Sequence, residues 1–220
     1  MSEIDKDIRN AKVWGVMIGK FSPMHRAQTR IFRKLAPFCD QLFIFVAGLK
    51  ESVENPFSFD LRKKIITNSL GPLSYKANIL PATIKREGKV LQTGYIKSLL
   101  QKINAMQRVD AIFVFVGQDR YRDFSKQLEE IQKDAKRFNK VRVINGGVQL
   151  NEFGEKINAT SLRGALLAND AEYIKRYLAP PIADNPTLFK EIYDQMKREM
   201  EETYDSQQFE KVVKKSNKTD

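Results

Sequence analysis

The stretch VWGVMIGKFSPMH (Val13–His25) decides the fold that we predict for this chain. Val13–Ile18 is a short apolar run, typical of a strand, and it is the first strand that we predict. Gly19 ends the run, and a glycine there lets a ligand approach the backbone closely. Pro23 stiffens the turn, and His25 lies at the expected start of a helix, where amide groups and the helix dipole favour an anion. The segment predicts a phosphate-binding loop between a strand and a helix, although an ordinary turn with a partly exposed histidine fits the same spacing.

Segments of strand and helix type alternate along the rest of the chain. Further strands are predicted at Leu42–Val46, Ala77–Leu80, Ala111–Val116 and Val141–Ile144. Helices are predicted at Arg26–Leu35, at Ser58–Leu70 with Ser58 as the cap, at Thr93–Met106, at Tyr121–Phe138, and at Ser161–Leu167 with Thr160 as the cap. This alternation predicts an α/β fold, a Rossmann-like parallel sheet flanked by helices.

A break at Ala179-Pro180-Pro181 separates a C-terminal extension. We expect an α/β domain in residues 1–180, and a C-terminal helix with a basic tail in residues 181–220. The helix is predicted over Leu188–Tyr204, because Leu188, Ile192, Met196 and Met200 recur at four-residue spacing. This apolar face either packs on its own domain or binds a partner helix, including that of a second copy.

Composition favours a folded protein of a reducing compartment. Of 220 residues, 42% are hydrophobic and 30% are charged, which is enough for a core. No run of about 18 apolar residues predicts a membrane span, and the polar N-terminus predicts no secretory signal. Cys39 is the one cysteine, so no intramolecular disulfide forms. We therefore expect a cytoplasmic protein.

Charge and the single histidine restrict the chemistry. Lys and Arg number 38 against 27 Asp and Glu, for a net charge of +11, which favours a polyanionic ligand such as a nucleotide, a nucleic acid or an anionic surface. A basic surface without a specific partner fits the same numbers. A Ser-His-Asp triad would have to use His25, and a zinc site of the His/Cys type could use only His25 and Cys39. We therefore predict no metal ligands in the protein.

Polar and glycine-containing segments follow each predicted strand. Ligands of parallel sheets bind outside the carboxyl ends of the strands. After the second strand come Gly48 and Asn55-Pro56-Phe57, after Ala111–Val116 comes Gly117-Gln118-Asp119-Arg120, and after the last strand comes Ile157–Arg163. We expect these segments to face one crevice, with hydroxyl, amide and cationic groups that hold phosphates and riboses. Taken alone, the last segment is also an ordinary capped helix with a surface arginine.

Three motifs carry a resemblance to a known family. GKFSPMHRAQ (residues 19–28) resembles the opening pattern G-[RK]-F-x-P-x-H-x-G-H of the HxGH nucleotidyltransferase superfamily, and INATSLR (residues 157–163) resembles its closing pattern I-S-x-T-x-x-R. ENPFSFDLR (residues 54–62) is similar to the NPF-x-x-x-x-R stretch of archaeal-type and bifunctional nicotinamide-mononucleotide adenylyltransferases. Divergent bacteriophage proteins of this fold share a segment like VFVGQDRYRDFSKQL (residues 114–128). The resemblance covers about Val13 to Leu178.

The resemblance implies transfer of an adenylyl group from ATP to a mononucleotide such as nicotinamide mononucleotide, as in NAD biosynthesis, with release of pyrophosphate. Mg²⁺ is expected to accompany the triphosphate. The catalytic positions implied are His25, Gln28, Lys20 and Arg163. The nucleotide-binding positions implied are Gly19, Phe21, Gly117, Asp119, Arg120, Thr160 and Ser161. Arg62 is expected to bind the phosphate of the acceptor.

The sequence departs from the family pattern directly after His25. Ala27 stands in place of the glycine and Gln28 in place of the second histidine, so a hydrogen-bond donor is kept but a positive charge is lost. Asn158 replaces the serine of the closing pattern. Three readings stay open: an active adenylyltransferase, a cytidylyltransferase of the same fold, or a non-catalytic member that binds nucleotide or nucleic acid or serves assembly, including as a homo-oligomer.

Overall fold

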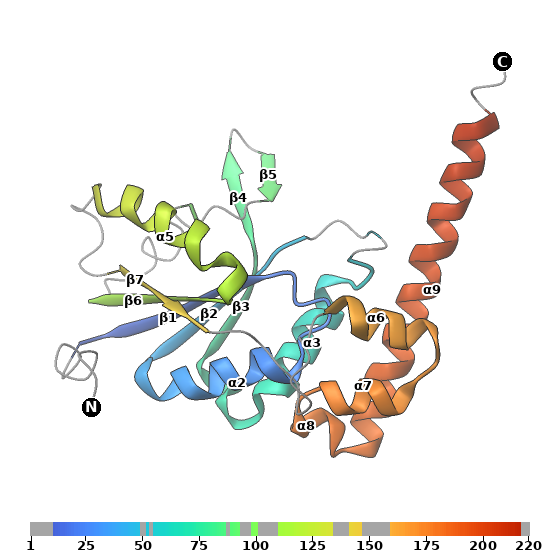
Figure 1. Cartoon of the computed structure of the whole chain (residues 1–220), viewed down its shortest axis with the longest axis horizontal. Helices are drawn as coiled ribbons and strands as arrows, with labels where there is room; N and C mark the ends of the chain where they lie inside the picture. The colour runs from blue at the N-terminus through green and yellow to red at the C-terminus, as the bar shows by residue number, and fades with distance from the viewer. Residues whose placement is uncertain are drawn as a thin grey trace.

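The computed structural model describes residues 11–48, 52, 55–86, 89–92, 98–100, 110–133, 141–146 and 159–216. Its centre is a parallel sheet of five strands in the order β3-β2-β1-β6-β7 (Figure 1). The strands are β1 (Val13–Gly19), β2 (Gln41–Val46), β3 (Ala77–Pro81), β6 (Ala111–Val116) and β7 (Val141–Asn145). All five were predicted from the sequence, and the Rossmann-like parallel sheet is confirmed.

The three central strands are buried on both faces because their side chains alternate between two apolar clusters. Val13 and Met17 of β1 contact the first cluster, whereas Trp14 and Val16 contact the second. Gly15 lies between Trp14 and Val16 in the sequence of β1, and a Cβ at this position would stand 2.7 Å from Cδ2 of Leu42. The absence of a side chain at this position therefore lets β1 and its neighbours pack closely.

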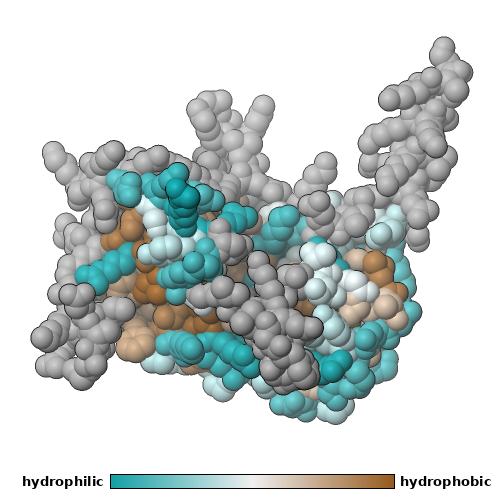
Figure 2. All heavy atoms as spheres, in the orientation of Figure 1, coloured by the Kyte–Doolittle hydropathy of each residue, from teal (hydrophilic) through white to brown (hydrophobic). Residues whose placement is uncertain are grey.

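Helices cover both faces of the sheet (Figure 1). α2 (Arg26–Leu35) and α3 (Phe59–Leu70) lie on one face, and α5 (Gln118–Lys133) covers the other, where Phe124 is buried. The predicted cap of α3 is confirmed, since Ser58 Oγ accepts a hydrogen bond from the Leu61 amide at 3.2 Å. Figure 2 shows hydrophilic residues on the outer faces of α2 and α5, with hydrophobic residues of the sheet between them.

Several short elements were not predicted. β4 (Thr83–Arg86) and β5 (Lys89–Gln92) form an antiparallel hairpin. The 3₁₀ helices η1 (Ala36–Phe38) and η2 (Gly71–Lys76) follow α2 and α3. α6 (Ala159–Leu167), which was predicted, is followed by α7 (Ala171–Tyr177) and α8 (Pro180–Ala183). The helix expected over Thr93–Met106 is described only at residues 98–100, and the remainder of that prediction lies outside the described residues, as do residues 134–138 of the predicted helix over Tyr121–Phe138.

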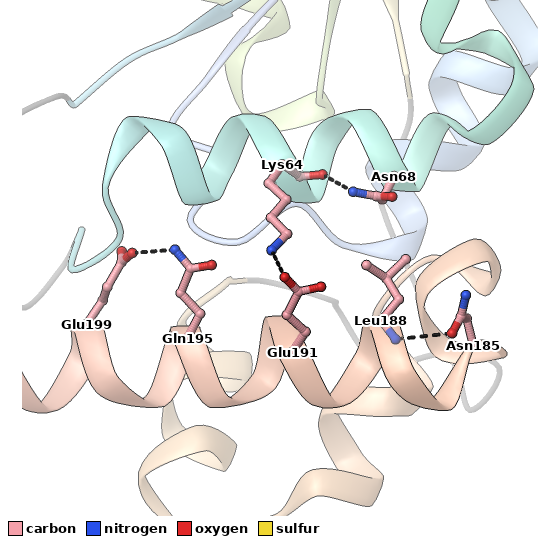
Figure 3. A network of polar contacts seen from close by, with 7 residues as sticks. All are labelled: Lys64, Asn68, Asn185, Leu188, Glu191, Gln195 and Glu199. Atoms are coloured by element: carbon pink, nitrogen blue, oxygen red, sulfur yellow. Dashed lines mark hydrogen bonds and ion pairs between the residues drawn. The ribbon is translucent and has the colours of Figure 1, made fainter.

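The C-terminal helix α9 (Pro186–Ser216) packs on α3 and then projects from the body of the protein (Figure 1). The apolar face predicted from the sequence is the buried one: Ile192, Met196 and Met200 are each at most 2% exposed and belong to the first apolar cluster. Lys64 of α3 pairs with Glu191 at 2.7 Å across this contact (Figure 3). Of the two alternatives for this face, packing on the same chain is the one observed. The division at residue 180 stays a prediction.

Candidate functional site

The loop between β1 and α2 has a tightly folded backbone. Phe21 has a φ of 47°, in the left-handed region, and its ring lies under Gly19, where a Cβ would stand 3.1 Å from Cζ of Phe21. The Ser22–Pro23 peptide bond is cis. The chain then becomes extended at His25, which is the N-cap of α2. This path turns the chain directly from the end of β1 into the helix N-terminus.

His25 is buried at that helix N-terminus, and within the described residues its Nδ1 has no hydrogen-bond partner. The residue is 4% exposed, and burial lowers the pKa of its imidazole from 6.5 to about 4. Ser22 Oγ in the same loop is also buried and lacks a partner in the described part of the chain. Buried polar groups normally have hydrogen-bond partners. A ligand that supplies polar atoms here would therefore satisfy a neutral histidine and a hydroxyl group.

Gln28 turns back towards the start of its own helix. Its Oε1 accepts a hydrogen bond from the His25 backbone N–H at 3.1 Å, as the acidic residue of a capping box does. Ala27 beside it is 5% exposed, so its methyl group is packed. The side chain at the position of the second histidine in the HxGH pattern thus stabilises the helix N-terminus through Oε1, and its amide nitrogen is the group left to donate.

Arg163 joins the first and last sequence motifs. Its Nη1 donates to the Ser22 carbonyl at 2.9 Å, and its Nη2 donates to Thr160 Oγ1 at 3.1 Å. This places the N-terminus of α6 next to the loop that carries His25. The side chains of Thr160 and Ser161 are exposed there. The N-termini of α2 and α6 therefore meet beside a guanidinium group. Neither helix has an acidic residue in its first turn, and this arrangement favours a bound anion.

The prediction that Thr160 caps α6 is wrong. The helix begins at Ala159, so Thr160 lies inside the first turn, and its hydroxyl accepts the bond from Arg163 instead. Asn158, Thr160 and Ser161 are all residue types that favour a cap, and for this reason the sequence pattern did not decide which residue precedes the helix.

Arg62 lies inside the protein rather than at its surface. Its side chain is 0% exposed. Nη1 donates to the carbonyls of Lys20 at 3.0 Å and Ala47 at 2.8 Å and to Asn55 Oδ1 at 3.3 Å, and Nε donates to the Ser58 carbonyl at 3.3 Å. The guanidinium thus links the loops after β1 and β2 to the start of α3. Lys20, by contrast, has an exposed side chain.

The remaining predicted positions follow β6. Gly117 follows that strand and is half-buried, and Arg120 is exposed in the first turn of α5. Asp119 belongs to the same turn, and its side chain lies outside the described part of the structure. Parallel register brings this segment to the edge reached by Gly19, since Met17 pairs with Phe115 and Gly19 with Val46. The segments after β1, β2 and β6 therefore lie at one edge of the sheet, as predicted.

Polar residues without a predicted role also contribute at this edge. Asn145 at the end of β7 donates through Nδ2 to Gln118 Oε1 and so links β7 to the start of α5. Asn55 donates to the Gly48 carbonyl while it accepts from Arg62. The signal for Asn145 was an amide residue at a strand end, whereas Asn55 lies in the connection between β2 and α3. Within the described residues, no group of three or more His, Cys, Asp or Glu side chains is arranged to hold a metal ion.

The chain shares its Rossmann-like fold with mononucleotide adenylyltransferases of solved structure. The chain is similar over 93% of its length to a bifunctional NMN adenylyltransferase/ADP ribose pyrophosphatase from Francisella tularensis, solved with AMP and a manganese ion, at 19% identity and a TM-score of 0.57. It spans 56% of that protein. No protein-family model matches the sequence.

Shorter enzymes of the same fold are matched almost completely. A Plasmodium falciparum nicotinic acid mononucleotide adenylyltransferase, complexed with APC, has 17% identity and a TM-score of 0.55, with 83% of this chain and 98% of that one covered. A putative nicotinate-nucleotide adenylyltransferase from Vibrio parahaemolyticus has 17% identity and a TM-score of 0.53, with 79% and 97% covered. None of the helices in the described part of the chain has the length and apolar character needed to cross a membrane.

Proposed function

We propose that this chain transfers an adenylyl group from ATP to a mononucleotide, with nicotinamide mononucleotide or its acid as the preferred class of acceptor. The observation that carries the proposal is a pair of buried polar groups, His25 Nδ1 and Ser22 Oγ, next to Arg163 and the N-terminus of α2. Neither group has a hydrogen-bond partner among the residues that the structure describes. A phosphate group supplies the oxygen atoms that these groups lack. The fold shared with mononucleotide adenylyltransferases supports the same assignment.

The proposed reaction is an in-line displacement. An oxygen of the acceptor's phosphate forms a bond to the α-phosphorus of ATP, the bond from that phosphorus to the bridging oxygen breaks, and pyrophosphate leaves. ATP enters as its Mg²⁺ complex. The attacking phosphate is already anionic, so no general base is required, and the protein contributes position and charge stabilisation.

Each site residue has a role in this proposal. Neutral His25 donates one N–H to an α-phosphate oxygen, and the amide nitrogen of Gln28 donates beside it. Arg163 and Lys20 supply the positive charge, because His25 is neutral above a pKa of about 4. The hydroxyl groups of Thr160 and Ser161 donate to the β- and γ-phosphates. Gly19, Phe21, Gly117, Asp119 and Arg120 line the position of the nucleoside.

Pyrophosphate release tests the proposal directly. ATP and CTP are offered in turn with nicotinamide mononucleotide, nicotinic acid mononucleotide and phosphopantetheine, and dinucleotide products are identified by mass. Turnover with ATP and a pyridine mononucleotide supports the proposal. Turnover with CTP alone assigns the chain to cytidylyl transfer and contradicts it.

A protein that binds nucleotide without transferring it is the second candidate. It is favoured by one observation: Gln28 Oε1 is used to cap α2, and neither Gln28 nor neutral His25 carries a charge. Calorimetric binding of ATP without any pyrophosphate release is the result that selects this candidate.

A further inference from the structure

The loops that would hold the nucleotide are tied together by a buried arginine. Arg62 donates to main-chain carbonyls of Lys20 and Ala47, which follow β1 and β2, and to Asn55 Oδ1. The sheet already joins the ends of β1 and β2, since the Ala47 amide donates to the Gly19 carbonyl at 2.8 Å. Arg62 is 42 residues from Lys20 and 15 from Ala47, and it ties this pair of strand ends to α3. One guanidinium thus fixes two strand ends relative to α3.

The same arginine is connected to the C-terminal helix through Ser58. Arg62 Nε donates to the Ser58 carbonyl, while the Ser58 amide donates to Glu199 Oε2 at 2.7 Å and Ser58 Oγ donates to Glu199 Oε1 at 3.1 Å. Glu199 is a residue of α9, which lies along α3 (Figure 3). A carboxylate at the N-terminus of α3 is also stabilised by the helix dipole. The Thr203 hydroxyl of α9 shares its proton between the Glu199 carbonyl of its own helix at 2.8 Å and the Pro56 carbonyl at 3.3 Å.

We propose that Arg62 is a positioning residue rather than a phosphate ligand, and that Glu199 holds it in place through Ser58, so that α9 sets the geometry of the nucleotide loop. The guanidinium is fully buried, and its Nη1 and Nε already donate to four oxygen atoms. Of the measurements that test this inference, only ATP binding and KM depend on the proposed function. It gives the C-terminal extension a role in the reaction, although α9 contributes no side chain to the phosphate-binding groups described above.

The test compares Arg62→Lys and Glu199→Gln in the full-length chain. A lysine keeps the charge but lacks the planar fork that spans several carbonyls. Matched controls are Lys63→Met, an exposed neighbour on α3, and Glu201→Gln, an exposed residue of α9. Hydrogen exchange of backbone amides in residues 19–25 is measured without nucleotide, and ATP binding is measured by calorimetry with Mg²⁺ present.

The expected result is faster exchange in residues 19–25 for both variants. Loss of one hydrogen bond to a charged group corresponds to about tenfold faster exchange for Arg62→Lys, and we expect about threefold for Glu199→Gln. Affinity for ATP falls in the same order, and the KM for the acceptor rises no more than that for ATP. Both controls leave exchange and affinity unchanged.

Two results overturn the proposal. An increase in the acceptor KM alone, with exchange in residues 19–25 unchanged, makes Arg62 a direct ligand of the acceptor. A lower unfolding midpoint for Glu199→Gln with unchanged exchange gives α9 a role in stability only. If the natural chain binds neither ATP nor CTP, the proposed function fails, whereas the exchange measurement still decides the role of Arg62.

Discussion

Introducing the glycine and histidine of the HxGH pattern at positions 27 and 28 is the perturbation that separates catalysis from folding. The double variant Ala27→Gly/Gln28→His removes the hydrogen bond from the His25 amide to Gln28 Oε1, 3.1 Å long, which is worth about 1 kcal/mol. It also removes a methyl group that is 95% buried and places a glycine in a helix, for about 1 kcal/mol more. We therefore expect the variant to be less stable by about 2 kcal/mol.

Turnover is expected to change in the opposite direction. A second imidazole at position 28 can carry a proton and stabilise negative charge that develops on the phosphate during transfer. One such preorganised donor is worth about 10²–10³ in rate. If Gln28 limits the natural chain, the double variant turns over faster even though it unfolds more easily. A gain in activity with a loss in stability cannot arise from better folding.

Pyrophosphate release and urea denaturation measure the two effects on the same samples. Ala27→Gly alone controls for helix stability, and Arg30→His places an imidazole at an exposed position of α2 outside the site. We expect both controls to keep the natural turnover number. A double variant that turns over no faster than the natural chain would refute the reasoning, because the amide of Gln28 would then serve as well as a histidine.

Three further predictions concern other features. Because the folded-state pKa of His25 is lowered from 6.5 to about 4, the free energy of unfolding is expected to fall by about 3 kcal/mol as the pH drops through this window. The variant His25→Gln removes the chain's one histidine and should remove this part of the pH dependence, as measured by chemical denaturation. Arg163→Lys cannot bridge Ser22 and bind phosphate at once, so kcat/KM for ATP should fall about tenfold to hundredfold; an unchanged value contradicts a phosphate contact. Gly15→Ala should destabilise by about 1–3 kcal/mol through contact with Leu42, whereas Gly164→Ala, with nothing within 4 Å, should not; equal thermal midpoints would refute this.

The strands were predictable because a strand that is buried on both faces is an uninterrupted run of apolar residues. Ala111–Val116 is apolar at every position, and each of its residues is buried in the structure. The β4–β5 hairpin gave no such signal, since its eight residues include Lys85, Arg86 and Lys89. α7 is seven residues long, with Ile174 as its one buried residue, so a helical period was too short to detect. Sequence patterns thus report core elements better than those that join them.

The positions of the site were more predictable than the roles of its residues. Motifs that end parallel strands must meet at one edge of the sheet, and they do. The sequence alone does not show whether an arginine binds a ligand or main-chain carbonyls. Only the fold shows that Arg62 is buried. The turn of Gln28 towards its own helix was equally hidden, because a glutamine can point either way from that position.

The geometry of the site separates the positive charge from the buried hydrogen-bond donors. His25 is neutral at physiological pH because burial lowers its pKa, and Gln28 has no charge to lose. Under the proposed function, stabilisation of a developing phosphate charge must then come from cationic side chains such as Arg163 and Lys20. A site of this kind gains no activity from protonation of its imidazole between pH 6 and 8. A chain with a titrating second histidine would show such a change, so under the proposed function we expect a flat pH profile of kcat in this range, with Gln28 at the position of the pattern's second histidine.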